Sequence, residues 1–435
     1  MRIAFVSDVD PYDRAAFSGS TYQILQIILA TGAKVEVVGP VMDKWRFKAI
    51  RLSTLPFRMM GQGVAWPKHP FLIQPCANEV DAAARRIKPD VIFSPGSNAI
   101  AYSNFLKPTI FWSDAPFAAM VDYYPWPQFQ NLTPESRQYG MAADTRAVRY
   151  SAAAIYRSSW GRDVAIHDHQ GDPARVHVLA LPGNLFRRWS LEEIEHLVPA
   201  RLNSPWKIFF SGVDWVRKGG DFAVAIVNEL VALGQPCELH VAGVTPPPEA
   251  MAQAKFPVRV LGRLNLNNID NRAILCNLLQ ESTFFVVPST AEALGLVFCE
   301  ALSAGVPAVG RATGGVPDAV MDGRTGFLIQ PGDKPAATAK RMFAAGRDAK
   351  TYTALATTSW MEWNARFANS AVIAKLTKIL ERADAAGSAA VARFTLLGRF
   401  EASSKDDPPA SGNGTRPELS PPNGRVRRHG GSCLS

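Results

Sequence analysis

The stretch "STAEALGLVFCE", residues 289–300, places Glu292 and Glu300 eight positions apart with Gly295 between them. On one continuous helix, eight residues at 100° each would turn the two carboxylates about 80° away from each other. Gly295 favours another structure, in which Glu292 lies in a loop and a helix beginning after the glycine carries Glu300 about one turn inside it. The two carboxylates would then flank a helix N-terminus, where backbone N–H groups bind phosphate.

The sequence on both sides of this stretch alternates short apolar strands with amphipathic helices, which is typical of an α/β protein with a mostly parallel sheet. We expect strands at residues 206–212, 237–243, 258–262, 284–289 and 307–310 around a helix at 219–234. The first half has the same pattern, with strands expected at 2–7, 34–39, 90–94, 109–114 and 153–159 and helices at 20–31, 78–88 and 135–150. The predicted fold class is therefore two Rossmann-like, doubly wound domains facing each other across a cleft at the carboxyl ends of their strands.

A length of 435 residues suits two such domains. A turn at Pro182-Gly183-Asn184 and the polar sequence after it put the boundary near residues 185–205. The predicted parts are a first domain at 1–190, a second at 200–368, a helix at 369–386 that returns towards the first domain, and a disordered tail at 387–435. The tail is rich in Ser, Pro, Gly and Arg and has no apolar periodicity.

The composition is that of a soluble globular protein, with 47% apolar and 20% charged residues. No apolar run reaches the length of a membrane span, and a first strand occupies the place of a signal peptide, so we expect a cytoplasmic protein. A net charge of +9 suits an anionic ligand, an anionic membrane surface or nucleic acid. Neither a metal site nor a disulfide framework is expected from the five scattered cysteines, Cys76, Cys237, Cys276, Cys299 and Cys433.

Candidate binding residues follow the predicted strands of the second domain. Arg217 and Lys218 stand in a loop just before a helix, where two cations can bind a diphosphate, although an isolated pair of this kind would favour a solvated basic turn. The backbone around Gly295 to Val297 is expected to point N–H groups at an anion. Glu300 could accept hydrogen bonds from the vicinal hydroxyls of a ribose, which favours a nucleotide as the ligand.

The chain resembles a known family on five motifs: "RKGG" (217–220), "EALGLVFCE" (292–300), "AGVPAVG" (304–310), "TGGVPD" (313–318) and "DGRTGFLI" (322–329). In this order and spacing they look like the second domain of the retaining glycosyltransferases of family four (group 1), which have the GT-B fold. The resemblance covers residues 205–385 strongly. The first half is similar more loosely, through "FSGST" (17–21), "IYRSSW" (155–160) and "LPGN" (181–184).

The resemblance implies a role for each matched residue. Lys218 with Arg217 would bind the donor diphosphate, and Glu292 would lie near the transferred sugar. The remaining donor-binding positions would be Gly19 in the first domain, Arg263 near the base, the backbone of Gly295, Leu296 and Val297, and Glu300 on the ribose.

Two positions depart from the family pattern. Many members have Gly-Arg where this chain has Gly212-Val213, and Arg217 is expected to substitute in part. Many also have a His-Asp-like pair where this chain has Ser113-Asp114, and Asp114 is expected to orient an acceptor hydroxyl.

The implied activity is metal-independent, retaining transfer of a sugar from a UDP- or GDP-sugar to a glycan or lipid-linked acceptor, with no cofactor and no nucleic acid partner. Glu292, Lys218 and Asp114 would carry the chemistry. The rival interpretations are a GT-B-fold nucleotide-sugar-binding protein or an epimerase without transfer activity. A phosphorylase would need a lysine that holds pyridoxal phosphate, and the sequence offers no convincing context for one.

Other motifs have competing interpretations. Asp8 and Asp10 could form a metal-binding D-x-D, but they follow the first strand, far from the nucleotide motifs. His167, His169 and His177 are interpreted as part of a polar surface loop and not as a zinc site. Residues 43–52 interleave cations with Trp45, Phe47 and Ile50. This pattern suits peripheral contact with the inner membrane face or binding of an anionic acceptor, and it suits an exposed amphipathic segment equally well. An aromatic cluster near the end of a predicted strand could stack on an acceptor sugar or pack in the core. Its residues are Tyr123, Tyr124 and Trp126.

Overall fold

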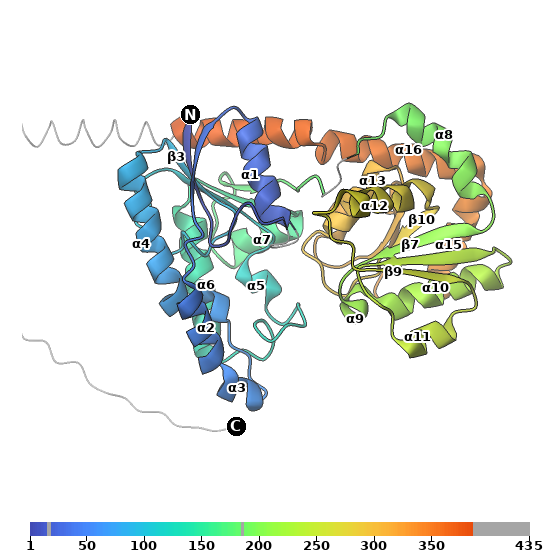
Figure 1. Cartoon of the computed structure of the whole chain (residues 1–435), viewed down its shortest axis with the longest axis horizontal. Coiled ribbons are helices and arrows are strands. Elements are labelled where there is room, and N and C mark those ends of the chain that lie inside the picture. Colours follow the sequence, from blue (N-terminus) through green and yellow to red (C-terminus); the bar gives the residue numbers. More distant parts are fainter. Residues whose placement is uncertain (15–18, 184–186, 386–435) are drawn as a thin grey trace, which may run out of the picture. The chain divides into compact units, whose positions relative to one another are not determined.

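The computed structural model describes residues 1–14, 19–183 and 187–385, which fall within one compact unit. Two six-stranded sheets dominate it, with strand orders β2-β1-β3-β4-β5-β6 and β12-β11-β10-β7-β8-β9. Figure 1 shows the first sheet among the blue and green elements of the first half and the second sheet in the second half. The predicted tail at 387–435 lies outside the described residues, as do residues 15–18 and 184–186.

The first half carries the elements up to β6. They are β1 (Arg2–Val6), α1 (Ser20–Ala30), β2 (Lys34–Val38), α2 (Lys44–Ser53), α3 (Leu55–Met59), the 3-10 turn η2 (Trp66–Lys68), α4 (Pro70–Ile87), β3 (Val91–Ser94), β4 (Thr109–Ser113), α5 (Phe117–Met120), α6 (Pro134–Tyr150), β5 (Ala153–Tyr156), α7 (Ser159–His167) and β6 (Val176–Val178).

The second half begins with a helix and then repeats the strand–helix pattern. Its elements are α8 (Leu191–Leu202), β7 (Trp206–Ser211), α9 (Trp215–Lys218), α10 (Gly220–Ala232), β8 (Cys237–Ala242), α11 (Pro248–Gln253), β9 (Val258–Gly262), α12 (Ile269–Glu281), β10 (Phe284–Val286), α13 (Leu296–Ser303), β11 (Ala308–Arg311), α14 (Val316–Ala319), β12 (Gly326–Ile329), α15 (Pro335–Arg347) and α16 (Ala349–Arg366).

The inner strands, such as β3, β4, β5 and β10, are short apolar runs that are buried on both faces, which is the pattern of a parallel sheet covered by helices. Every residue of β3 and of β10 is buried, and neighbouring strands pair in parallel. Since parallel strands share one carboxyl edge, the loops that leave that edge come together even when they are far apart in sequence.

Helices cover both faces of the first sheet. One face packs against α1 and against a helix of residues 369–385, whose Val372 and Leu376 lie in one apolar cluster with Ile3 and Phe5. Figure 1 shows this helix, in orange, running from α16 to the first half. The other face packs against α4 and α6. The second sheet has its own core, which includes side chains of α8, the helix that spans the expected domain boundary.

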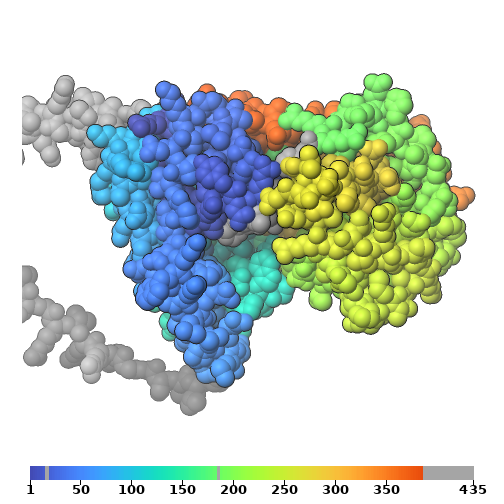
Figure 2. Space-filling view, viewed as in Figure 1, coloured from blue at the N-terminus to red at the C-terminus, as the bar shows by residue number. Residues whose placement is uncertain are grey.

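The structure adds elements that the sequence pattern did not predict. The strands β6 and β12 are three and four residues long, too short for period-2 patterning to be recognised. The helices α2 and α3 lie at the lower end of the first half in Figure 1 and form part of its outer surface in Figure 2. Among the described helices, none combines the length and apolar character needed to cross a membrane.

Candidate functional site

Three loops of the second half leave the carboxyl ends of neighbouring strands. β10 lies between β7 and β11 in the sheet, so the loops after β7, β10 and β11 are adjacent. They contain "VDWVRKGG", "PSTAEALG" and "ATGG", respectively. The sequence motifs expected to bind the donor are therefore gathered at one edge of one sheet.

Arg217 and Lys218 end a single helical turn, α9, where the sequence predicted a loop. That prediction was wrong because Asp214, which the sequence analysis did not single out, accepts a hydrogen bond from the Arg217 backbone N–H at 3.0 Å and so caps the turn. The turn ends at Gly219, after which α10 begins. The short helix holds both cations under the neighbouring loop, where their side chains are 8% and 9% exposed.

Glu292 joins the two cations. Lys218 Nζ donates to Glu292 Oε1, and Arg217 Nη1 lies 3.2 Å from the same oxygen. Arg217 Nη1 also donates to the Ala291 carbonyl at 2.9 Å, and Ser289 Oγ donates to Glu292 Oε1 at 3.2 Å. One buried carboxylate thus holds two buried cations at the carboxyl edge of the sheet. We refer to Arg217, Lys218 and Glu292 as the cation–glutamate group.

The electrostatics of this group keep the carboxylate ionised. Burial by itself raises the pKa of Glu292, but Lys218 and Arg217 and the hydrogen bonds they donate outweigh burial, and the pKa is lowered from its ordinary value. The arrangement is a buried cluster in which one carboxylate faces two cations, and Arg217 Nε also lies 3.6 Å from Asp214 Oδ2. An anionic ligand that enters would compete with Glu292 for the same two cations.

Gly295 ends the loop and α13 begins at Leu296, as the sequence predicted. The glycine has φ 81°, a left-handed conformation in which a side chain is strained, and it offers no side-chain cap. The first-turn N–H groups, including those of Leu296 and Val297, therefore lack acceptors within the helix. A helix end of this kind favours an anion.

Glu300 lies in the second turn of α13 and is 6% exposed. A Cβ atom on Gly183 would lie 2.8 Å from Glu300 Cγ, so Glu300 packs directly on the backbone of Gly183. Gln23 of α1 donates to the carbonyl of this same glycine. Glu292 and Glu300 thus stand before and inside the start of α13, as their spacing predicted.

The remaining predicted donor positions are more dispersed. Gly19 is buried as the N-cap of α1, directly after residues 15–18, which the structure does not describe. Arg263 is exposed just after β9, the edge strand of the second sheet. Val213, which replaces the arginine of the family pattern, is 67% exposed. The cation that stands beside Lys218 is Arg217, the residue expected from the sequence to substitute in part for the missing arginine.

Asp114 follows β4 in the first sheet and pairs with a residue that the sequence analysis did not single out. Arg157, at the end of β5, places Nη2 2.5 Å from Asp114 Oδ1. Arg157 is buried and its Nε has no hydrogen-bond partner, whereas the Asp114 side chain is 52% exposed. β4 and β5 are neighbours, so a carboxylate beside a buried cation stands at the carboxyl edge of the first sheet.

Tyr123 connects the first half to the Glu292 loop. Its hydroxyl accepts a hydrogen bond from the Glu292 backbone N–H at 3.0 Å and lies 3.0 Å from Thr313 Oγ1. Gly314 approaches both groups closely, because a Cβ there would lie 2.1 Å from the Glu292 carbonyl oxygen and 2.4 Å from the Tyr123 hydroxyl. The glycine pair in "TGGVPD" thus allows the backbone to approach Glu292 and Tyr123 closely. A second link joins the halves where Ser159 Oγ donates to the Asp318 carboxylate at 2.8 Å.

The aromatic residues near Tyr123 pack on one another and on Arg217, which is the core-packing alternative considered from the sequence. Tyr124 is buried and stacks on Trp126 with ring centroids 4.6 Å apart, which is core packing. The Arg217 guanidinium lies 5.9 Å from the Tyr124 ring and 5.5 Å from the Trp126 ring, within cation–π range. The aromatic pair therefore covers the cation–glutamate group on one side, and Trp126 is 37% exposed.

The interpretation of the three histidines as a polar surface loop was wrong. His167 ends α7, His177 lies in β6, and His169 is fully buried, with Nε2 accepting from the Ala118 backbone N–H at 3.3 Å. The polar sequence around His169 suggested an exposed loop. The imidazole can nevertheless be buried, because hydrogen bonds satisfy its ring nitrogens. Within the described residues, no group of three or more His, Cys, Asp or Glu side chains could hold a metal ion.

Asp8 and Asp10 have different surroundings. Burial raises the pKa of Asp8, which lies 3.5 Å from Asn98 Nδ2, whereas Asp10 accepts from the Tyr12 backbone N–H at 2.9 Å and is exposed. The two carboxylates therefore belong to separate hydrogen-bonding arrangements.

A buried ion pair that the sequence analysis missed supports the first sheet's carboxyl edge. Lys68 of η2 donates to Asp144 of α6 and, at 2.7 Å, to Ser97 Oγ. Asp144 Oδ2 also accepts from the Phe117 backbone N–H at 2.6 Å. Burial acts to raise the pKa of Asp144, but Lys68 and the other donors lower it overall. This pair joins η2, α5 and α6 beneath the loops that leave the first sheet.

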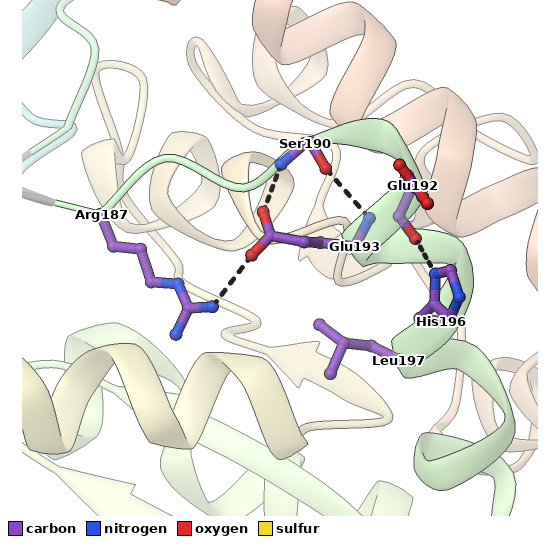
Figure 3. A pocket seen from close by; sticks show the side chains of 6 residues that line it. All are labelled: Arg187, Ser190, Glu192, Glu193, His196 and Leu197. Atoms are coloured by element: carbon purple, nitrogen blue, oxygen red, sulfur yellow. Dashed lines mark hydrogen bonds and ion pairs between the residues drawn. The ribbon is translucent and has the colours of Figure 1, made fainter.

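Figure 3 shows a pocket at the start of α8 that has a structural explanation. Ser190 and Glu193 form a capping box, with hydrogen bonds of 3.1 and 2.7 Å, and Arg187 Nη2 lies 3.3 Å from Glu193 Oε1. His196 Nδ1 lies 2.7 Å from the Glu192 carbonyl oxygen. The side chains that line this pocket cap and stabilise the N-terminus of α8. The pocket shares no residue with the cation–glutamate group.

Comparison with protein families matches residues 205–348 to the model of glycosyl transferases group 1. The match lies within the predicted second domain and covers less than half of the chain. The matched residues include the whole cation–glutamate group and all of α13, so the resemblance predicted from the sequence is confirmed over this domain.

Curated relatives are similar mainly over part of their length. The D-inositol 3-phosphate glycosyltransferase of Streptomyces scabiei is 29% identical over 210 residues, which is 45% of this chain and 46% of that protein. The alpha-D-kanosaminyltransferase of Streptomyces kanamyceticus is 23% identical over 245 residues, 54% of this chain and 62% of that protein. The chain thus spans less than two thirds of the length of either relative.

Solved structures extend the likeness to both halves. Anabaena HepE in complex with UDP has a TM-score of 0.57 at 17% identity and covers 88% of this chain and 100% of its own. Sucrose-phosphate synthase of Thermosynechococcus elongatus has a TM-score of 0.62 at 16% identity and covers 89% and 100%. Together with the two parallel six-stranded sheets, these matches confirm the predicted GT-B fold.

Proposed function

We propose that this chain transfers a sugar, with retention of configuration and without a metal ion, from a UDP- or GDP-sugar to a hydroxyl of a glycan or lipid-linked acceptor. The observation that carries the proposal is the cation–glutamate group, which lies beside the start of α13 within the group 1 domain. Its cations match a diphosphate, and its carboxylate matches sugar hydroxyls. Uracil as the base of the donor nucleotide is supported by likeness to HepE, whose structure was solved in complex with UDP.

The charges suggest how the residues divide the reaction. Breaking the bond between the sugar's anomeric carbon and the diphosphate oxygen puts negative charge on the leaving group, and Lys218, Arg217 and the α13 N-terminus stabilise it. The positive character that develops on the anomeric carbon is stabilised by the departing diphosphate on the same face. The acceptor oxygen then bonds to that face, and its proton passes to the leaving phosphate. Asp114 orients the acceptor hydroxyl.

The first test is nucleotide release from a panel of UDP-, GDP- and ADP-sugars, with and without EDTA. We expect one UDP- or GDP-sugar to be preferred and the rate to be unchanged by EDTA, because protein cations and the helix N-terminus take the place of a metal. Rates abolished by EDTA would overturn metal independence. Tight binding of a donor with no nucleotide release would instead support a binding protein without turnover, and conversion of the donor to its epimer would support an epimerase.

The ribose role of Glu300 predicts weaker donor binding in Glu300→Ala. A charge-assisted hydrogen bond contributes about 1.5–3 kcal/mol, so the dissociation constant of the preferred nucleotide should rise about tenfold to a hundredfold. Isothermal titration calorimetry with the nucleotide diphosphate measures it, and Glu300→Gln controls for the packing of the side chain on Gly183. Unchanged nucleotide affinity in both variants would contradict the ribose role.

A further inference from the structure

The helices α2 and α3 expose an unusual concentration of large apolar side chains. Six of the 21 large apolar residues exposed in the described chain fall within residues 45–60. Their exposed fractions are 68% for Trp45, 68% for Leu52, 44% for Leu55, 40% for Phe57, 88% for Met59 and 66% for Met60. Scattered single residues of this kind are ordinary on a protein surface, but a cluster marks an interaction site.

These side chains have no role in the core of the first half. α3 contributes no buried residue. α2 is held from its other side, where Ile50 is buried and Phe47 contacts the Trp66 ring at 5.0 Å. On a helix, Trp45 and Leu52 lie about 20° apart, whereas Ile50 is about 140° from Trp45. α2 is therefore anchored by one face and presents Trp45 and Leu52 on another.

The same segment is strongly basic. Residues 43–60 contain five Lys or Arg and one acid, a net charge of +4. The acid, Asp43, is used as the N-cap of α2 and accepts from the Trp45 backbone N–H at 2.7 Å. The basic side chains Lys44, Lys48, Arg51 and Arg58 are exposed, beside the apolar ones. An amphipathic surface with cations and a tryptophan suits the boundary between lipid headgroups and acyl chains.

We propose that the surface formed by residues 44–60 of α2, α3 and the turn after them docks on an anionic lipid bilayer. The bilayer offers acyl chains to the apolar side chains and negative charge to the cations. A second copy of this chain is a poor occupant, because a two-fold symmetric contact through this surface would bring two like-charged segments together. Figure 2 shows the α2–α3 region on the outer surface of the first half, where a membrane can reach it.

The docking surface is connected to the candidate site. α2 follows the carboxyl end of β2, which is the same edge of the first sheet that carries Asp114. The chain after α3 pairs with the loop after the aromatic residues, because the Gly63 backbone N–H donates to the Asn131 carbonyl at 2.8 Å and Thr133 N–H donates to Gly63 at 3.1 Å. If the proposed transfer activity holds, docking brings this edge to a lipid-linked acceptor.

The test is co-sedimentation of the full chain with vesicles of phosphatidylcholine alone or mixed with phosphatidylglycerol. We expect sedimentation with the anionic vesicles only, decreasing as salt is raised because counterions screen the cations. Residues beyond 385 include Arg425, Arg427 and Arg428, so variants must assign the contribution of α2–α3. Trp45→Ser/Leu52→Ser/Met59→Ser/Met60→Ser removes four exposed apolar groups, and Lys44→Gln/Lys48→Gln/Arg58→Gln removes three exposed charges.

Each of these variants should lower vesicle affinity at least tenfold. The matched control is Ile269→Ser/Met361→Ser, which removes apolar groups that are 71% and 50% exposed in the second half and should bind vesicles like the wild type. Thermal unfolding verifies that the variants remain folded. Wild-type protein that stays in solution with both vesicle types overturns the proposal, as does an apolar variant that binds normally. A lipid-free dimer that the apolar variant converts to monomer also overturns it, in favour of a second copy.

Vesicle binding requires no sugar transfer, so the two proposals fail separately. Loss of nucleotide release with intact vesicle binding would reject the proposed activity alone. Nucleotide release with a water-soluble acceptor but no vesicle binding would reject docking alone.

Discussion

Lys218→Ala is expected to lower kcat/KM for the preferred nucleotide sugar about 100- to 1000-fold. Removing one preorganised group that stabilises the charge developing in a transition state typically costs a factor of about 10²–10³. Lys218 is such a group if the diphosphate is the leaving group, because it is a buried cation at the carboxyl end of β7 and is held in place by Glu292. Steady-state nucleotide release at saturating acceptor gives the ratio.

Two further variants separate the charge from the fold. Lys218→Met keeps an unbranched stem against Gly212, where a Cβ would lie 2.6 Å from Lys218 Cγ, and should lose as much activity as the alanine variant. Lys207→Ala removes a lysine within β7, the strand that precedes Lys218, but its ion pair with Glu281 is exposed, so little change is expected. Activity retained in Lys218→Met would show that the ammonium group does not stabilise the leaving group.

The sequence predicted the parts of the site that depend on strand ends and helix starts. Lys218 and Glu292 are 74 positions apart, yet each follows an apolar strand, and parallel strands bring such positions to one edge. The start of α13 could be predicted because a glycine tolerates the left-handed backbone at which the loop ends and the helix begins. These features follow from local pattern and from the geometry of parallel sheets.

Contacts between the halves could not be predicted in the same way. The hydrogen bond from the Glu292 backbone N–H to Tyr123 joins residues 169 positions apart and depends on how two sheets pack. Arg157 lies within a quoted motif, but its pairing with Asp114 depends on the order of β4 and β5 in the sheet. His169 was assigned to the surface because its sequence neighbours are polar, while its burial depends on Ala118 and Thr145 from other elements.

Glu292→Gln is expected to reduce kcat about a hundredfold or more while leaving nucleotide diphosphate binding unchanged or tighter. In the free protein, Glu292 occupies the two cations that the diphosphate needs, so loss of its charge removes a competitor. The amide keeps an oxygen that can accept from Lys218 and Arg217, which preserves the geometry. The transition state loses a carboxylate beside the sugar, so the rate falls although binding does not.

The two parameters are measured separately, kcat by nucleotide release and affinity by calorimetry with the free nucleotide diphosphate. Parallel loss of both would mean that Glu292 positions the cations and does not act on the sugar.

The thermal stability of the Glu292→Gln variant provides an independent readout. Because the pKa of Glu292 in the folded protein lies below its ordinary value of 4.5, the stabilisation from its ionised form is present above that pH and is lost as pH falls through the lowered pKa. Wild type should therefore unfold at a higher temperature than Glu292→Gln at neutral pH, and the difference should shrink as the solution becomes acidic enough to protonate the carboxylate.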